Sequence, residues 1–78
     1  MKLKTLDLHK AKHGDVENLV CNFLNWTQPP CRIITGNSEK MKEIVKEIVK
    51  NYKYSCYNES MYNHGSLIVV EESIYDFE

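Results

Sequence analysis

Two helical stripes, each preceded by a short β-prone run, are the feature that most constrains the fold of this chain. Apolar residues recur at the i, i+3, i+4, i+7, i+8 spacing of an amphipathic helix at Val16, Leu19, Val20, Phe23 and Leu24. The second stripe consists of Met41, Ile44, Val45, Ile48 and Val49. Each stripe predicts a helix with one buried side, and strands separated by such helices indicate right-handed parallel crossovers.

Capping residues and β-prone runs give the expected order of the elements. Asp15 is predicted to cap the first helix, and the prolines at 29 and 30 end it. Ser38 is predicted to cap a second helix over about residues 39–51. The expected strands cover residues 2–9, 31–35, 54–58 and 67–70. This β-α-β-α-β-β order predicts an α/β two-layer sandwich (α+β) with a four-stranded mixed sheet and two helices on one face.

The length of the chain is that of a single domain. Its 78 residues are 42% hydrophobic and 27% charged, an ordinary balance for a globular protein. We expect one domain over residues 1–78, with a core at about 3–71 and an acidic tail at 72–78. Because no apolar run approaches the ~18 residues of a membrane span and no signal-peptide stretch is present, we expect a cytoplasmic monomer without a membrane partner.

The cysteines are odd in number and far apart. Cys21, Cys31 and Cys56 contain no C-x-x-C pair. We therefore expect core or near-core thiols in preference to a disulfide framework or a zinc site. A reactive thiol is the alternative interpretation.

Charge is distributed unevenly along the sequence. All ten Lys and Arg residues lie between Lys2 and Lys53, together with six acidic residues. Residues 54–78 hold the other five acidic residues and no Lys or Arg. Such a split can concentrate positive potential on one part of the surface, which suits a polyanion, although ordinary solvated faces also produce it.

An Asp-x-His pair closes the first predicted strand. Because side chains alternate along a strand, Asp7 and His9 share one face, ~7 Å apart along the strand, while Leu6 and Leu8 face the core. A carboxylate beside a group that titrates near neutral pH is suited to proton transfer. The alternative is a structural pair that caps the loop after the strand.

The second motif is the turn Gly36-Asn37-Ser38, which joins the second strand to the second helix. N–H groups at a helix start favour a phosphate, the glycine allows a close approach, and the serine and Lys40 add a hydroxyl donor and a charge. A capped turn without a ligand is the alternative. His9 and Thr35 end adjacent parallel strands in the predicted topology, so the pair and the turn should meet at one edge of the sheet.

Three landmarks follow one another along the chain. They are Leu6-Asp7-Leu8-His9, Ile34-Thr35-Gly36-Asn37-Ser38 and Gly65-Ser66-Leu67-Ile68-Val69-Val70-Glu71. Together they resemble the small MutS-related (Smr) domain family, which opens with L-D-L-H-G, carries a central H-G-x-G-x-G or T-G-x-G loop and finishes with a G-x-G-x-x-x-V-type strand. The resemblance spans about residues 3–71. The family fold resembles the C-terminal domain of bacterial translation initiation factor three, which agrees with the predicted order of elements.

The resemblance implies a nucleic-acid-binding domain with endonuclease activity on RNA or DNA. Several family members are linked to nicking of DNA or cleavage of RNA, including messenger RNA on stalled or collided ribosomes. The family's Asp and His map onto Asp7 and His9, and its loop maps onto Thr35, Gly36, Asn37 and Ser38. In this hypothesis His9 is the general acid or base, and Asp7 orients it or binds a divalent ion. The phosphate is held by the loop with Lys10, Arg32 or Lys40.

The need for a metal depends on the substrate. RNA carries its own nucleophile in the 2′-hydroxyl, so a metal is unnecessary. For DNA, water must attack, and a magnesium-type ion would assist it. A single Asp is a poor metal site, and we predict no dedicated metal ligands and no other cofactor.

The chain also departs from the family pattern. Lys10 replaces a glycine, Thr35 stands where many members have a second His, and Ser38 and Lys40 replace further loop glycines. Two alternatives therefore stay open: a module that binds nucleic acid or a ribosome surface without chemistry, and a protein-interaction domain that uses the acidic tail. His13 and His64 are interpreted, respectively, as a candidate second imidazole and a surface residue.

Overall fold

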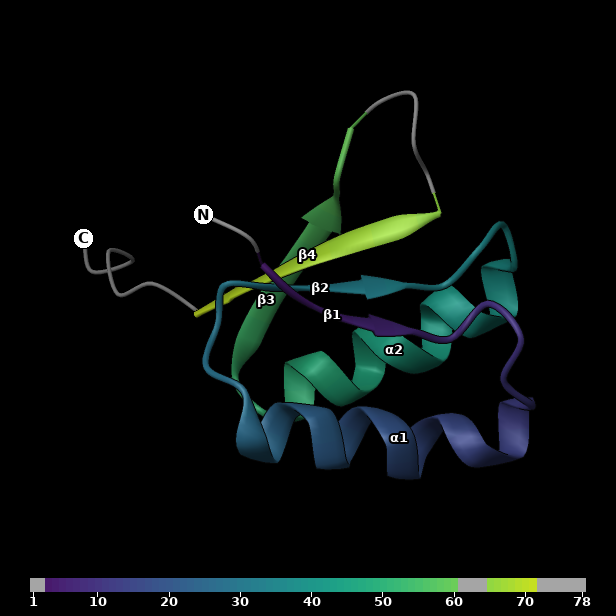
Figure 1. Cartoon of the computed structure of the whole chain (residues 1–78), viewed down its shortest axis with the longest axis horizontal. Helices are drawn as coiled ribbons and strands as arrows, with labels where there is room; N and C mark the ends of the chain where they lie inside the picture. The colour runs from purple at the N-terminus through teal and green to yellow at the C-terminus, as the bar shows by residue number, and fades with distance from the viewer. Residues whose placement is uncertain (1–2, 61–64, 72–78) are drawn as a thin grey trace.

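The computed structural model describes residues 3–60 and 65–71. In chain order, the elements are β1 (Lys4–Asp7), α1 (His13–Trp26), β2 (Cys31–Ile34), α2 (Glu39–Asn51), β3 (Tyr54–Asn58) and β4 (Ser66–Glu71). The strands form one sheet in the order β1-β2-β4-β3, and both helices cover the same face of it (Figure 1). The predicted fold class, a four-stranded mixed sheet with two helices on one face, is confirmed.

The sheet combines a parallel and an antiparallel part. β1 runs parallel to β2, with Leu6 opposite Ile33. β4 lies between β2 and β3 and is antiparallel to both. The carboxyl ends of β1 and β2 therefore lie at the same edge of the sheet as the start of β4, and the loops that follow the two parallel strands meet there (Figure 1).

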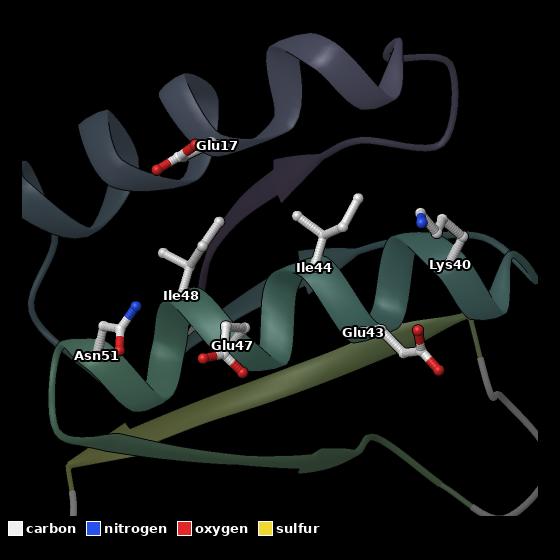
Figure 2. Close-up of a pocket in the computed structure, with 7 residues that line it drawn as sticks. All are labelled: Glu17, Lys40, Glu43, Ile44, Glu47, Ile48 and Asn51. Carbon is white, nitrogen blue, oxygen red and sulfur yellow. The ribbon is translucent and has the colours of Figure 1, made fainter.

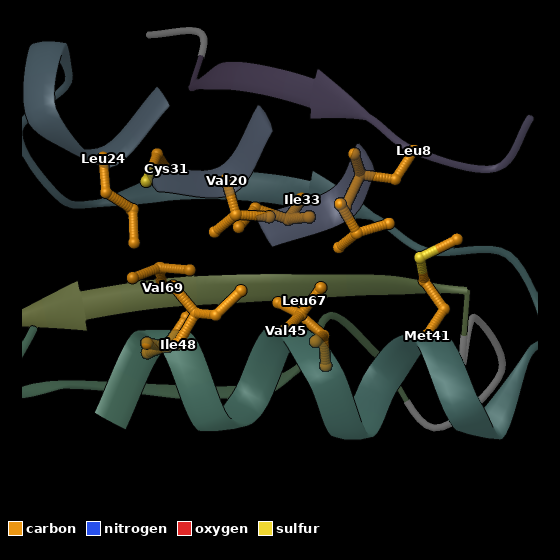
Figure 3. Close-up of a cluster of buried hydrophobic side chains, with 12 residues drawn as sticks. Leu8, Val20, Leu24, Cys31, Ile33, Met41, Val45, Ile48, Leu67 and Val69 are labelled. Carbon is orange, nitrogen blue, oxygen red and sulfur yellow. The ribbon is translucent and has the colours of Figure 1, made fainter. Parts of the chain in front are cut away.

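Alternation along the strands places the core between the sheet and the helices. Ile33 and Leu67, from β2 and β4, are fully buried, and so is Leu8, which follows β1. Val20 of α1 and Val45 of α2 pack from the helix side (Figure 3). The burial of each such side chain contributes about 1.5–3 kcal/mol, so this one layer stabilises the domain.

The predicted capping residue is confirmed for α2 and is wrong for α1. α2 begins as expected, because the Ser38 hydroxyl oxygen accepts a hydrogen bond from the Met41 N–H at 3.1 Å. α1 begins at His13, and the predicted cap at Asp15 is wrong. Asp15 lies in the first turn, where its carboxylate interacts favourably with the same exposed N–H groups that a cap would satisfy.

β1 is shorter than predicted, since it ends at Asp7 and the chain turns at His9 and Lys10. Among the residues that the structure describes, no helix has the length and apolar character that a membrane span requires. The predicted acidic tail and His64 lie outside the described residues.

Candidate functional site

The Asp7–His9 pair lies at the carboxyl end of β1. One oxygen of Asp7, Oδ1, accepts a hydrogen bond from the His9 backbone N–H at 3.1 Å and lies 2.5 Å from His9 Nδ1. The two side chains are in direct contact because the chain turns immediately after Asp7, whereas a continued strand would separate them. Both side chains are about half exposed, so the pair is open to a ligand.

Asp7 is the acceptor of both hydrogen bonds. The hydrogen bond from the His9 side chain, followed by that from the His9 backbone, holds the pKa of the Asp7 carboxyl below its ordinary value. The charge of Lys10 acts in the same direction. An ionised carboxylate only accepts, so the proton of a neutral His9 ring lies on Nδ1 and Nε2 is left as the basic nitrogen.

The turn at residues 36–38 lies directly beside His9. Gly36 has a φ of +71°, which favours glycine. A Cβ added at Gly36 would lie 3.4 Å from His9 Cβ, so the two backbones approach closely at this point. The structure thus brings together the two motifs that the sequence placed at one edge of the sheet.

Gly65, just before β4, holds this turn in place. Its carbonyl oxygen accepts hydrogen bonds from the Thr35 N–H at 2.7 Å and from the Gly36 N–H at 3.1 Å. The hydroxyl of Thr35, a buried residue, donates to the Gly36 carbonyl at 3.0 Å. Two of the predicted phosphate-binding residues, Thr35 and Gly36, therefore use these donors to build the turn. The role of Gly65 was not predicted, although this glycine opens the third landmark of the sequence.

The remaining residues of the turn are placed differently. Asn37 is exposed, and Ser38 caps α2 through its oxygen while its hydroxyl proton is still able to donate. Lys10 is exposed and directly follows His9. Lys40, in the first turn of α2, borders the groove between α1 and α2 (Figure 2).

Arg32 is engaged in a separate cluster on the face of the sheet without helices. Its Nη2 donates to the Glu59 carboxylate at 2.8 Å, and its Nη1 donates to the Thr5 hydroxyl at 3.4 Å. The guanidinium is thus already neutralised by a carboxylate. Of the predicted phosphate-binding cations, Lys10 directly follows His9 in sequence, and its charge acts on the Asp7 carboxyl.

Other candidate groups show no activated chemistry. The cysteines are free, and burial raises the pKa of the Cys31 and Cys56 thiols, which disfavours the nucleophilic thiolate. His13 is the exposed first residue of α1. Over residues 3–60 and 65–71, no three or more His, Cys, Asp or Glu side chains gather as metal ligands would.

Comparisons with models of known protein families, with curated proteins and with solved structures find no match for this chain. The site is therefore interpreted from its own geometry. It presents an imidazole whose Nδ1 contacts a carboxylate and whose Nε2 is the basic nitrogen, a close glycine turn at a helix start, and a neighbouring lysine. This arrangement can move a proton beside a bound anion.

Proposed function

We propose that this chain is an Smr-like nucleic-acid-binding domain that cleaves phosphodiester bonds in RNA or DNA, with His9 as the general acid or base. The observation that carries the proposal is the Asp7–His9 contact, which leaves Nε2 of a half-exposed ring available beside the Gly36 turn. A positioned imidazole of this kind accelerates proton transfer by about 10²–10⁴-fold.

On an RNA substrate the proposed step balances as follows. Nε2 of His9 takes the proton of a 2′-hydroxyl, O2′ attacks the adjacent phosphorus, and the bond from phosphorus to O5′ breaks. The products are a cyclic 2′,3′-phosphate and a 5′-hydroxyl whose proton comes from solvent. Lys10 and the Ser38 hydroxyl are the groups proposed to hold the phosphate, because Lys10 is exposed directly after His9 and the cap of α2 leaves the Ser38 hydroxyl proton able to donate.

The test is a cleavage assay with labelled single-stranded RNA and with supercoiled DNA, each with and without a chelator. We expect His9→Ala to reduce the cleavage rate by about 100-fold or more and Asp7→Asn by a smaller factor, with nucleic-acid affinity retained in both. Lys50→Ala, at the far end of α2, is the control for unspecific changes. Undiminished cleavage in both His9→Ala and Asp7→Asn would refute the catalytic role of the pair, since a contaminating nuclease would explain it.

A binding module without chemistry is the second candidate function. It is favoured by the internal engagement of the Thr35 hydroxyl and the Gly36 N–H, which the turn itself uses. In the same assay, this alternative predicts that the wild-type protein binds RNA or DNA at low salt but cleaves neither.

The variant His13→Ala tests whether a second imidazole contributes to cleavage. A cleavage rate below that of the wild type in this variant would assign His13 to the site.

A further inference from the structure

The facing sides of α1 and α2 enclose a groove that the candidate nuclease site does not use. The groove has a volume of about 340 Å³. The half-buried Ile44 and the 7% exposed Ile48 point from α2 toward α1 and form an apolar floor, and Glu17 lines the groove from α1 (Figure 2). Glu43 and Glu47 stand along the α2 side.

The three carboxylates of this groove have no basic partner within ion-pair distance in the described part of the chain. The acidic side chains that do form ion pairs there are Asp7, Glu39 and Glu59. Glu17, Glu43 and Glu47 therefore surround the apolar floor with negative charge that exceeds the single positive charge of Lys40 in the lining. A concave surface with an excess of one sign of charge concentrates the potential and attracts the opposite sign.

We propose that this groove binds a basic amphipathic helix of a partner protein. Glu43 and Glu47 are one helical turn apart, and so are Ile44 and Ile48 in the neighbouring row. A partner helix with Lys or Arg at positions i and i+4 matches the two glutamates. Aliphatic side chains at a similar spacing on that helix match the two isoleucines. The groove runs along α2 from Lys40 to Asn51, which corresponds to about 16 Å or three turns of a helix.

Lys40 gives the groove a direction. It is the basic residue among those that line the groove, and it stands at the end where α2 begins. A bound cationic side chain is repelled at that end and attracted over Glu43 and Glu47. The partner helix therefore places its basic residues over the middle of α2 and neutral or acidic residues next to Lys40.

The negative charge of the groove also disfavours binding of a second copy of this chain or of a nucleic acid. A second copy that docks through the same groove would bring the carboxylates of both copies together, which is unfavourable. A nucleic acid would place its phosphates against the same carboxylates. The basic helix is the occupant whose charge is complementary to this surface, and its binding does not depend on the proposed cleavage of nucleic acid.

The test uses a 14-residue alanine-based helical peptide with two Leu and three Lys on one face, and a matched peptide in which Glu replaces each Lys. We expect the basic peptide to bind, measured by fluorescence anisotropy, and to shift NMR amide signals of α1 and α2 along the groove. The double variant Glu43→Gln/Glu47→Gln should weaken this affinity about fivefold or more. Glu39→Gln, on the same helix outside the groove, is the matched control and should keep the wild-type affinity.

Three results of the affinity measurements would overturn the proposal. These are a basic peptide that does not bind, an acidic peptide that binds equally well, and an affinity that is the same in Glu43→Gln/Glu47→Gln as in the wild type. Signal shifts that map to the Gly36 turn instead of the groove would also contradict it. Because neither glutamate belongs to the candidate nuclease site, the cleavage rate of the double variant is expected to equal that of the wild type. This separates a failure of the groove proposal from a failure of the proposed function.

Discussion

A single carboxylate oxygen of Asp7 holds both the backbone and the ring of His9. The two hydrogen bonds, donated by the backbone N–H and by the Nδ1–H of His9, span only two residues of the chain. Both bonds join residues 7 and 9, so they orient the imidazole without help from distant residues. Because the contact is local, the effect of each of the two residues on the pKa of the other can be tested by single substitutions.

The Asp7 carboxyl should titrate below the ordinary value of 3.8, and His9→Ala should raise its pKa toward that value. The return should be partial, because the backbone N–H of residue 9 still donates to the carboxylate in the variant. A carboxyl whose pKa is lowered by folding stabilises the protein at pH values above the ordinary pKa. This contribution is lost as the pH falls through the lowered pKa of the folded state. The measurement is an NMR titration of the side-chain carboxyl carbons. An Asp7 pKa unchanged by His9→Ala would contradict the ring contact.

Gly36→Ala should destabilise the domain by about 1–2 kcal/mol, since an alanine at a φ of +71° adopts the left-handed conformation at that cost. The added Cβ would make an ordinary van der Waals contact with His9 Cβ at 3.4 Å, so the cost comes from the backbone conformation. Chemical unfolding measures the free energy of unfolding, with Gly14→Ala as the control. Nothing lies within 4 Å of a Cβ at Gly14, and no positive φ is found there. Equal effects of the two substitutions would show that the Gly36 turn is not specifically constrained.

The residues that could be predicted from sequence are those whose placement is local. Asp7 and His9 lie two positions apart, and Ser38 directly precedes its helix, so spacing alone indicates their contacts. The engagement of Arg32 with Glu59 could not be predicted, because 27 positions separate the two residues and the register of three strands decides their approach. The hydrogen bonds to Gly65 join residues about 30 positions apart and depend on the same register.

At the scale of the elements, the two helices differ in how their starts are stabilised. The Ser38 oxygen caps α2, whereas Lys12 precedes α1 without a side-chain cap. The apolar stripes predicted both helices and the sandwich correctly, because burial of one side of a helix is a strong periodic signal. The start of α1 was predicted incorrectly, since Asp15 can favour a helix either as a cap or in the first turn.

Ser38→Ala should lower the free energy of unfolding by about 1 kcal/mol, because the Met41 N–H loses its acceptor. In a domain of this size such a loss corresponds to a Tm lower by about 4–8 °C. Ser38→Asp, which keeps an acceptor at the cap, is the matched variant and should retain most of the stability. Thermal unfolding followed by circular dichroism measures both. A Tm of Ser38→Ala equal to that of the wild type would mean that the cap adds nothing.

At the scale of the whole molecule, the proposed functions occupy different parts of the surface. The Asp7–His9 pair and the Gly36 turn lie at the edge of the sheet where β1 and β2 end, and the acidic groove lies between the helices (Figures 1 and 2). A nucleic acid at the first surface avoids the carboxylates of the second. The domain could therefore hold a nucleic acid and a basic helix at the same time.

Nucleic-acid affinity should fall as the salt concentration rises. The slope of log K against log salt reflects the number of lysines that contact phosphates. For single strands, the phosphate contact proposed for Lys10 contributes about −0.7 to the slope of log K against log salt. Lys10→Ala should reduce the magnitude of this slope by about 0.7, whereas Lys50→Ala should leave it unchanged. Binding titrations at several salt concentrations measure the slope. A slope that is the same in Lys10→Ala as in the wild type would exclude Lys10 from the phosphate contacts.

The double hydrogen bond to the Gly65 carbonyl links the turn beside His9 to the last strand of the sheet. The Asp7–His9 contact joins residues two positions apart, so it needs no later part of the chain to form. The turn can adopt its native geometry only after residue 65 has been added, more than fifty positions later. Under the proposed function, a nascent chain that ends before residue 65 would carry the Asp7–His9 pair without the turn that presents a phosphate to it.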